Sequence, residues 1–251
     1  MTEKKLFFGL KRSKSEPVEK LLCMSHDQVE LPSKFSLRDK VKQVYDQLSL
    51  SSCSANATAN FLLLSDKVDC NISRLFMYFC TRYLDNNHIM PVEDHGATLK
   101  NVFVALTRYH FIEALKYPYI VEKVNVVPSQ EIFKEAITIN KSPITSYRQI
   151  LPSKYNIKYI LAHLKKPILF GIMVYSNFFR LTKENDILYP PSASDEMLGG
   201  HAIVLISYDD ETETFGILNS HGSNFCDHRY FRLSYSYAPI PELAFEFYIV
   251  D

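Results

Sequence analysis

The amino-acid sequence predicts an α+β fold, with helices in its first part and antiparallel strands in its second. Apolar residues recur at helical spacing between about residues 54 and 164, whereas β-branched and aromatic runs separated by polar turns dominate from residue 168 onward. The 251 residues, 47% of them hydrophobic, suffice for one large domain or two closely packed lobes. We therefore expect the helices and the strands to segregate within one unit.

Each expected helix begins at a capping residue that precedes an apolar stripe. The first is a small-residue helix over 54–64, for which Ser51 or Ser52 can serve as the N-cap, so that Cys53 lies in its first turn. The others are expected after Ser73, around 99–106, from Pro128-Ser129, and after Asn156.

The expected strands lie at 168–175, 201–208, 214–219, 230–235 and 244–250, with one more within 142–150. We interpret the chain as a single domain over 1–251. Its parts are an N-terminal arm at 1–30 laid over the surface, a mainly helical lobe at about 31–140, and a mainly β lobe at about 141–251.

Composition excludes several classes of function. Lys plus Arg and Asp plus Glu both number 28, so no global field attracts nucleic acid or an anionic membrane. No apolar run reaches the roughly 20 residues of a membrane span, and the start lacks a secretory signal. The five cysteines form no disulfide framework, which indicates an intracellular protein in a reducing compartment. We expect a monomer by default.

Cys53 occupies the position of a nucleophile. In the first turn of a helix the backbone N–H groups have no intrahelical partner, and the helix dipole favours negative charge. A thiol there is shifted toward thiolate, and an oxyanion beside it finds hydrogen-bond donors.

A histidine and two amides complete the predicted site. His201 begins a buried strand after Gly199-Gly200, and Asn219 ends the next strand, within reach across a hairpin. The Asn219 carbonyl can then orient the imidazole, which is the scheme of covalent acyl transfer. Gln47 stands six positions before Cys53 and can supply an oxyanion donor beside the Cys53 N–H.

With these residues in view, the chain resembles the papain-like cysteine peptidases, in the branch found in bacteria and large DNA viruses. The order Cys, His, Asn and the distances along the chain suit that family. The segments that carry the resemblance are Leu31-Pro32, Leu37-Arg38-Asp39, Asp46-Gln47, Ser52-Cys-Ser-Ala-Asn-Ala57, Ser73-Arg-Leu-Phe76, Pro118-Tyr119, Gly199-Gly-His-Ala202, Asn219-Ser-His-Gly222 and Tyr230-Phe231.

The resemblance implies a cysteine-type endopeptidase that acts through a thioester acyl-enzyme. It makes Cys53 the nucleophile, His201 the acid and base, Asn219 the orienting residue and Gln47 the oxyanion donor. It also implies two lobes, one helical and one β-barrel-like, with a cleft between them that holds an extended polypeptide substrate against Gly96, Ala97 and Gly200. No cofactor and no metal are implied.

Three departures from the family carry expectations of their own. Ser52 replaces the usual glycine and is expected to crowd the substrate, and His221 replaces a tryptophan and is expected to leave the His201–Asn219 bond wetter. The arm at 1–30 is shorter than the family's usual pro-segment, so we expect it to belong to the mature protein. Its deletion is then expected to leave the activity similar or modestly altered.

Alternatives remain at the level of sequence. One is a catalytically silent papain-like module that binds peptides. Another is a zinc site built from potential ligands, although no paired ligand motif is present; these ligands are His221, Cys226 and His228, with His88 and His95 as extras. Transfer of the acyl group to an amine instead of water shares the same intermediate and is also open.

Overall fold

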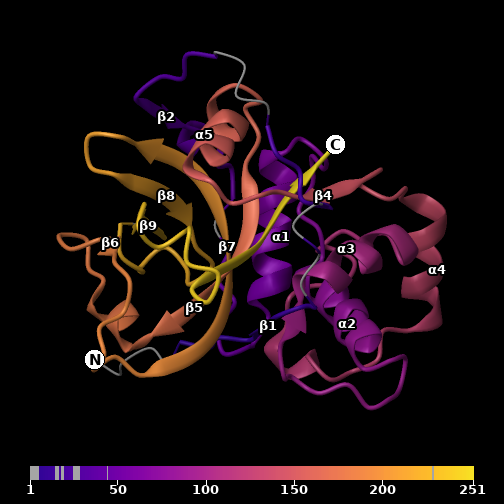
Figure 1. Cartoon of the computed structure of the whole chain (residues 1–251). Coiled ribbons are helices and arrows are strands. Elements are labelled where there is room, and N and C mark those ends of the chain that lie inside the picture. The colour runs from indigo at the N-terminus through magenta and orange to yellow at the C-terminus, as the bar shows by residue number, and fades with distance from the viewer. Residues whose placement is uncertain (1–5, 15–16, 18–19, 25–28, 44, 228) are drawn as a thin grey trace.

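Most helices lie on one side of the molecule and most strands on the other, with the central helix α1 between them and α5 on the strand side (Figure 1). The computed structural model describes residues 6–14, 17, 20–24, 29–43, 45–227 and 229–251. The helices are α1 (Cys53–Leu64), α2 (Arg74–Asp85), α3 (Leu99–Arg108), α4 (Gln130–Ile139) and α5 (Lys154–Ala162). The predicted α+β class is confirmed.

The strands form one large, mostly antiparallel sheet in the order β4-β10-β5-β7-β8-β9-β6. Along the chain these strands are β4 (Tyr147–Gln149), β5 (Ile168–Tyr175), β6 (Ile187–Leu188), β7 (Met197–Asp209), β8 (Thr214–Leu218), β9 (Tyr230–Ser234) and β10 (Ala244–Val250). Three shorter strands, β1 (Leu10–Lys11), β2 (Lys34–Ser36) and β3 (Ala97–Thr98), attach beside this path. Strand β7 is the longest and pairs with β5, β8, β1 and β2.

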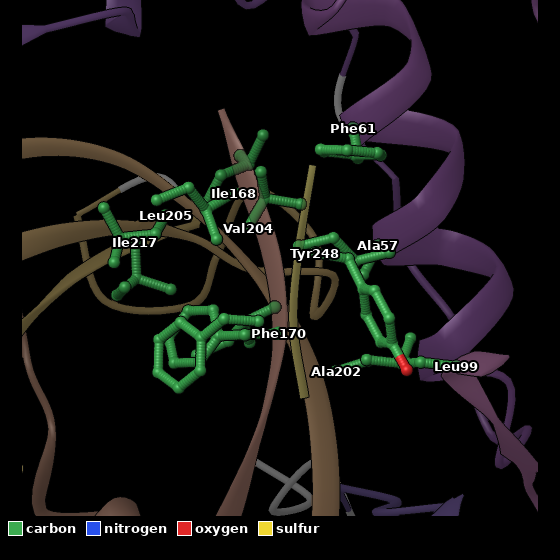
Figure 2. Close-up of a cluster of buried hydrophobic side chains, with 14 of the residues drawn as sticks. Ala57, Phe61, Leu99, Ile168, Phe170, Ala202, Val204, Leu205, Ile217 and Tyr248 are labelled. Carbon is green, nitrogen blue, oxygen red and sulfur yellow. The ribbon is translucent and has the colours of Figure 1, made fainter. Parts of the chain in front are cut away.

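Helix α1 is buried on nearly all sides, which explains its composition. It packs against β7 and β5 on one side and against α2 and α3 on the other. Small residues such as Ala55, Ala57 and Ala59 allow this close approach and are almost completely buried. Figure 2 shows Ala57 and Phe61 of α1 facing Ala202 and Tyr248 of the sheet. Helix α1 and strand β7 thus form the seam between the two sides.

Side-chain caps fix where most helices begin. Ser73, Ser129 and Ser153 each accept a hydrogen bond from a backbone N–H in the first turn that follows. The caps expected at Ser73 and Ser129 are confirmed. The one expected at Asn156 is wrong, because Ser153 caps α5 and the Asn156 amide instead donates to the Leu151 carbonyl at 2.9 Å.

Candidate active site

The four predicted catalytic residues lie at element ends along the seam. Cys53 begins α1, His201 lies near the start of β7, Asn219 follows β8 directly, and Gln47 stands before α1. Each is at most 1% exposed. The backbone amide of Ala202, next to His201, faces the Cys53 sulfur, and Ser220, next to Asn219, donates a hydrogen bond to the Gln47 side chain. The structure therefore brings all four together.

Asn219 fixes the orientation and the tautomer of His201. Its Oδ1 lies 2.7 Å from His201 Nε2 and also accepts the Ser220 N–H at 2.8 Å, so that this atom is the carbonyl oxygen. A neutral His201 then carries its proton on Nε2. Nδ1 has no hydrogen-bond partner among the described residues and is the nitrogen left to act as a base.

The His201–Asn219 bond lies in a dry, aromatic environment. The His221 ring stacks on the His201 ring with centroids 4.7 Å apart and planes at 4°, and Asn219 Nδ2 lies 3.0 Å from His221 Nδ1. Phe178 and Phe8 meet both imidazoles edge-on. The expectation that His221 leaves this bond wet is therefore wrong for the described form, because His221 and two phenylalanines cover it.

The polar groups of Gln47 are held by several partners. Its N–H donates to the Ser220 carbonyl and its Oε1 accepts from Ser220 Oγ, both at 2.9 Å. Its Nε2 donates at 2.9 Å to the Leu50 carbonyl and at 2.9 Å to the carbonyl of Phe7. The side-chain amide is thus fixed before any reaction and is already aimed at a peptide carbonyl.

Ser52 does not crowd this site, contrary to expectation. Its side chain is fully buried, with Oγ 2.5 Å from the Tyr119 hydroxyl and accepting from Asn56 Nδ2 at 2.9 Å. These bonds explain why Ser52, the N-cap residue of α1, makes no side-chain cap.

The described residues 6–10 of the N-terminal arm run across the predicted catalytic residues. The Gly9 amide faces the Cys53 sulfur, and Phe8 covers His201 and His221 with ring centroids 5.5 and 5.8 Å away. Leu10 is only 6% exposed. Residues 8–10 of the arm therefore fill the seam between the two sides, whereas the sequence suggested a segment laid over the surface.

Gly96, Ala97 and Gly200, predicted to contact the substrate, contact the arm. Leu10 pairs in parallel with Ala97 and in antiparallel with Gly200, and Ala97 N–H donates to the Gly9 carbonyl at 2.9 Å. A Cβ on Gly96 would lie 1.7 Å from that carbonyl oxygen, so only glycine permits this approach. These three residues offer a backbone edge on which an extended chain binds.

Burial under the arm alters both titrating groups. It lowers the pKa of His201 to about 4, against the opposing effect of the Asn219 hydrogen bond. It also raises the pKa of the Cys53 thiol, and the backbone amides of Ala202, Gly9, Ser54 and Cys53 reduce that rise. Near neutral pH the described form therefore holds a thiol and a neutral imidazole. The thiolate expected from the sequence is therefore disfavoured in this form.

We expect acid to destabilise this covered form. An exposed His201 takes up its proton near pH 6.5 and the covered one near 4, so unfolded and uncovered forms bind protons first as the pH falls. The resulting loss in the free energy of unfolding is absent above pH 6.5, is complete below pH 4, and amounts to roughly 3 kcal/mol. Urea unfolding between pH 7 and 4 measures it, with His201→Gln as the variant that cannot titrate. Equal pH dependence in both proteins would contradict the shift.

The residues considered for zinc do not converge. Cys226 Sγ donates to the Thr182 carbonyl at 3.0 Å, His88 faces Arg108, and His95 pairs with Glu93. His228 lies outside the described residues. Within the described part of the chain no three His, Cys, Asp or Glu side chains gather as metal ligands.

Sequence reasoning missed the arm and the aromatic cover. The only local signal was the apolar run Leu6-Phe-Phe-Gly-Leu10 in an otherwise polar N-terminus. Phe178 gave no signal of its own, because it lies in a short 3-10 turn, Ser176–Arg180.

The geometry defines a class of enzyme chemistry. A thiol at a helix N-terminus, an imidazole oriented by an amide, and a fixed amide donor aimed at a peptide carbonyl suit covalent acyl transfer on sulfur. The model of the family described as "Papain family cysteine protease" matches residues 31–242. The chain belongs to this family and is a cysteine-type endopeptidase that hydrolyses peptide bonds.

A viral relative and several solved structures support this assignment. An uncharacterized peptidase C1-like protein, L477, of Acanthamoeba polyphaga mimivirus is 31% identical over 220 residues, which cover 82% of this chain and 68% of the relative. The crystal structure of xylellain, a cysteine protease from Xylella fastidiosa, matches with a TM-score of 0.85 and 27% identity over 99% of this chain and 97% of xylellain. The fold is therefore papain-like.

Other papain-like structures share the fold at lower identity. Procathepsin B S9 from Trypanosoma congolense matches with a TM-score of 0.71 and 13% identity over 97% of this chain and 86% of its own. The Carica candamarcensis cysteine protease CMS1MS2, solved in complex with E-64, matches with a TM-score of 0.60 and 16% identity over 81% of this chain and 89% of its own.

Among the described residues, no helix is long and apolar enough to cross a membrane.

Proposed function

We propose that Cys53 is the nucleophile of this peptidase. Its thiol proton passes to His201 Nδ1, the sulfur attacks the carbonyl carbon of the scissile bond, and the resulting oxyanion accepts hydrogen bonds from Gln47 Nε2 and the Cys53 N–H. Imidazolium His201, oriented by Asn219, protonates the leaving amine, and a thioester remains on sulfur. His201 then takes a proton from water, which attacks the thioester and releases the acid and the thiol.

One observation supports these roles: a peptide carbonyl of the chain's own arm accepts a hydrogen bond from the proposed oxyanion donor. Gln47 Nε2 donates to the Phe7 carbonyl at 2.9 Å, while the Gly9 amide of the same segment faces the Cys53 sulfur and opposes the rise in the pKa of its thiol. A substrate carbonyl in the same position would accept the same hydrogen bond from Gln47. The roles of Cys53 and Gln47 are thus supported by a bound segment of peptide.

The same observation indicates that the described form is latent. A peptide must displace Phe8 and Gly9 before it reaches Cys53. We propose that its substrates are extended polypeptides that use the backbone edge of Ala97 and Gly200 in place of Leu10. We also propose an intracellular setting, because all five cysteines are free thiols.

Labelling with a thiol-directed electrophile tests the nucleophile. A peptidyl chloromethyl ketone at neutral pH, whose peptide part itself displaces the arm, is expected to modify Cys53, and mass spectrometry identifies the labelled cysteine. Cys23 is exposed and serves as the internal reference for an ordinary thiol. If Cys23 or Cys226 reacts first and Cys53 remains unmodified, the assignment fails.

A further inference from the structure

A guanidinium group lies against the turn that carries Gln47 and leads into Cys53. Arg74, the first residue of α2, stacks its guanidinium between two tyrosine rings, 4.4 Å from the Tyr45 centroid and 4.0 Å from that of Tyr119. Its NH1 donates to the Asp46 carbonyl at 3.2 Å and to Asn56 Oδ1. The cation therefore contacts the residue before Gln47 and the residue one helical turn after Ser52.

The partners of Arg74 reach the catalytic groups directly. Asn56 Nδ2 donates at 2.9 Å to both the carbonyl and the hydroxyl of Ser52. The Tyr119 hydroxyl lies 2.5 Å from Ser52 Oγ and donates to the Gln47 carbonyl at 2.9 Å. Two chains of contacts thus start at Arg74, one ending at the peptide unit of Gln47 and the other at that of Ser52, which supplies the Cys53 N–H.

Keeping a cation at this place is costly. Burial lowers the pKa of Arg74, and its interactions with Tyr119, Tyr45 and Asp46 only partly offset this effect. Its hydrogen bonds go to neutral oxygens, and charge-assisted bonds of this kind are stronger than those between neutral groups. What the side chain holds explains why this residue is an arginine and not an apolar residue. Cation–π stacking fixes the plane of the guanidinium, and its NH1 group holds two oxygens.

We propose that Arg74 is a positioning residue for the oxyanion hole. It holds the Asp46–Gln47 backbone directly and the Ser52–Cys53 backbone through Asn56. The Gln47 amide and the Cys53 N–H thereby keep the separation at which both reach one oxyanion. This inference rests on the proposed roles of Cys53 and Gln47.

The test compares steps that use the oxyanion hole with a step that does not. In Arg74→Met we expect kcat for a peptide substrate to fall roughly 10- to 100-fold with KM nearly unchanged. Affinity for a peptide aldehyde, which forms a tetrahedral adduct on sulfur, should fall by a similar factor. Alkylation of Cys53 by iodoacetamide, which forms no oxyanion, should stay within twofold of the parent chain.

A matched variant separates positioning from general stability. Arg82 lies on the same helix, stacks on Tyr78 at 4.3 Å and donates to the carbonyls of Val92 and Val124, away from Gln47. Arg82→Met should lower stability and leave kcat within a few fold. Should Arg74→Met not fold, Tyr119→Phe removes only the hydroxyl that bonds Gln47 and Ser52, and it should show the same pattern.

The outcomes are distinct. Unchanged kcat and aldehyde affinity in a folded Arg74→Met, or in Tyr119→Phe, would overturn the positioning role, as would an equal loss in Arg82→Met. A fall in alkylation equal to the fall in kcat would show that Arg74 acts on the thiol and not on the oxyanion hole. A parent chain that neither cleaves peptide nor labels at Cys53 would overturn the proposed catalytic residues instead.

Discussion

Cys53→Ala is expected to abolish peptide hydrolysis and leave the fold intact. The sulfur is the only atom in the proposed mechanism that forms a covalent bond with the substrate, and removing the nucleophile of such a triad lowers kcat roughly 10⁴- to 10⁶-fold. The side chain is fully buried at the start of α1, so its loss leaves a small cavity that costs about 1 kcal/mol. Steady-state hydrolysis of a fluorogenic peptide and a urea unfolding curve measure the two effects.

Cys80 provides the matched control for this variant. Its thiol is also buried, with the residue 1% exposed, and it lies on α2 in a cluster of buried apolar side chains that includes Phe76 and Phe79. Cys80→Ala should lose similar stability and keep its activity within a few fold. Residual hydrolysis by Cys53→Ala above a thousandth of the parent rate would show that another group is the nucleophile.

Much of the site could be predicted because its residues carry local signals. Cys53 follows serines at a helix start, His201 follows two glycines, and Asn219 ends a strand, so that each lies at the end of an element. The sheet then brings these ends together, since β7 and β8 pair in antiparallel just beyond His201 and Asn219. Prediction succeeded where an element boundary and a reactive side chain coincide.

The remainder depends on contacts between residues far apart in sequence. The Ser52 hydroxyl could cap α1, yet it bonds Tyr119, which lies 67 positions away. Arg74 follows a helix cap and gives no local sign that it meets Asp46 and Asn56. Hydrogen bonds of this kind follow from tertiary packing, which no local pattern of apolar and polar residues records.

The arm is the largest departure from expectation, because the expectation for it rested on its length alone. Its removal was expected to leave the activity similar or modestly altered. Its position instead favours a larger effect, because Phe8 covers the His201 imidazole, Gly9 faces the Cys53 sulfur and Leu10 pairs with the backbone edge. A few residues are enough to block access to the site when each of them covers one of the proposed catalytic groups.

Gly9→Val is therefore expected to activate the enzyme. A Cβ at residue 9 would lie 2.2 Å from the Ser51 carbonyl oxygen, a distance that real Cβ atoms do not adopt, so the arm must shift away from Ser51. Overpacking of this kind costs about 1–3 kcal/mol, and kcat/KM should rise roughly 10- to 100-fold as the uncovered form becomes populated. Peptide hydrolysis and the rate of Cys53 alkylation should rise together, since both require access to the same sulfur.

Two further variants show whether the rise comes from uncovering the site. Phe8→Ala removes the ring over His201 and His221 without adding any atom near Ser51, so it should also activate, by a smaller factor. Lys11→Ala alters an exposed side chain of the same arm and should leave kcat/KM unchanged. If Gly9→Val and Phe8→Ala both keep the parent rates of hydrolysis and alkylation, the arm does not limit access. If both lower hydrolysis, the arm forms part of the working site, because a segment that only blocks the thiol cannot reduce activity when it is displaced.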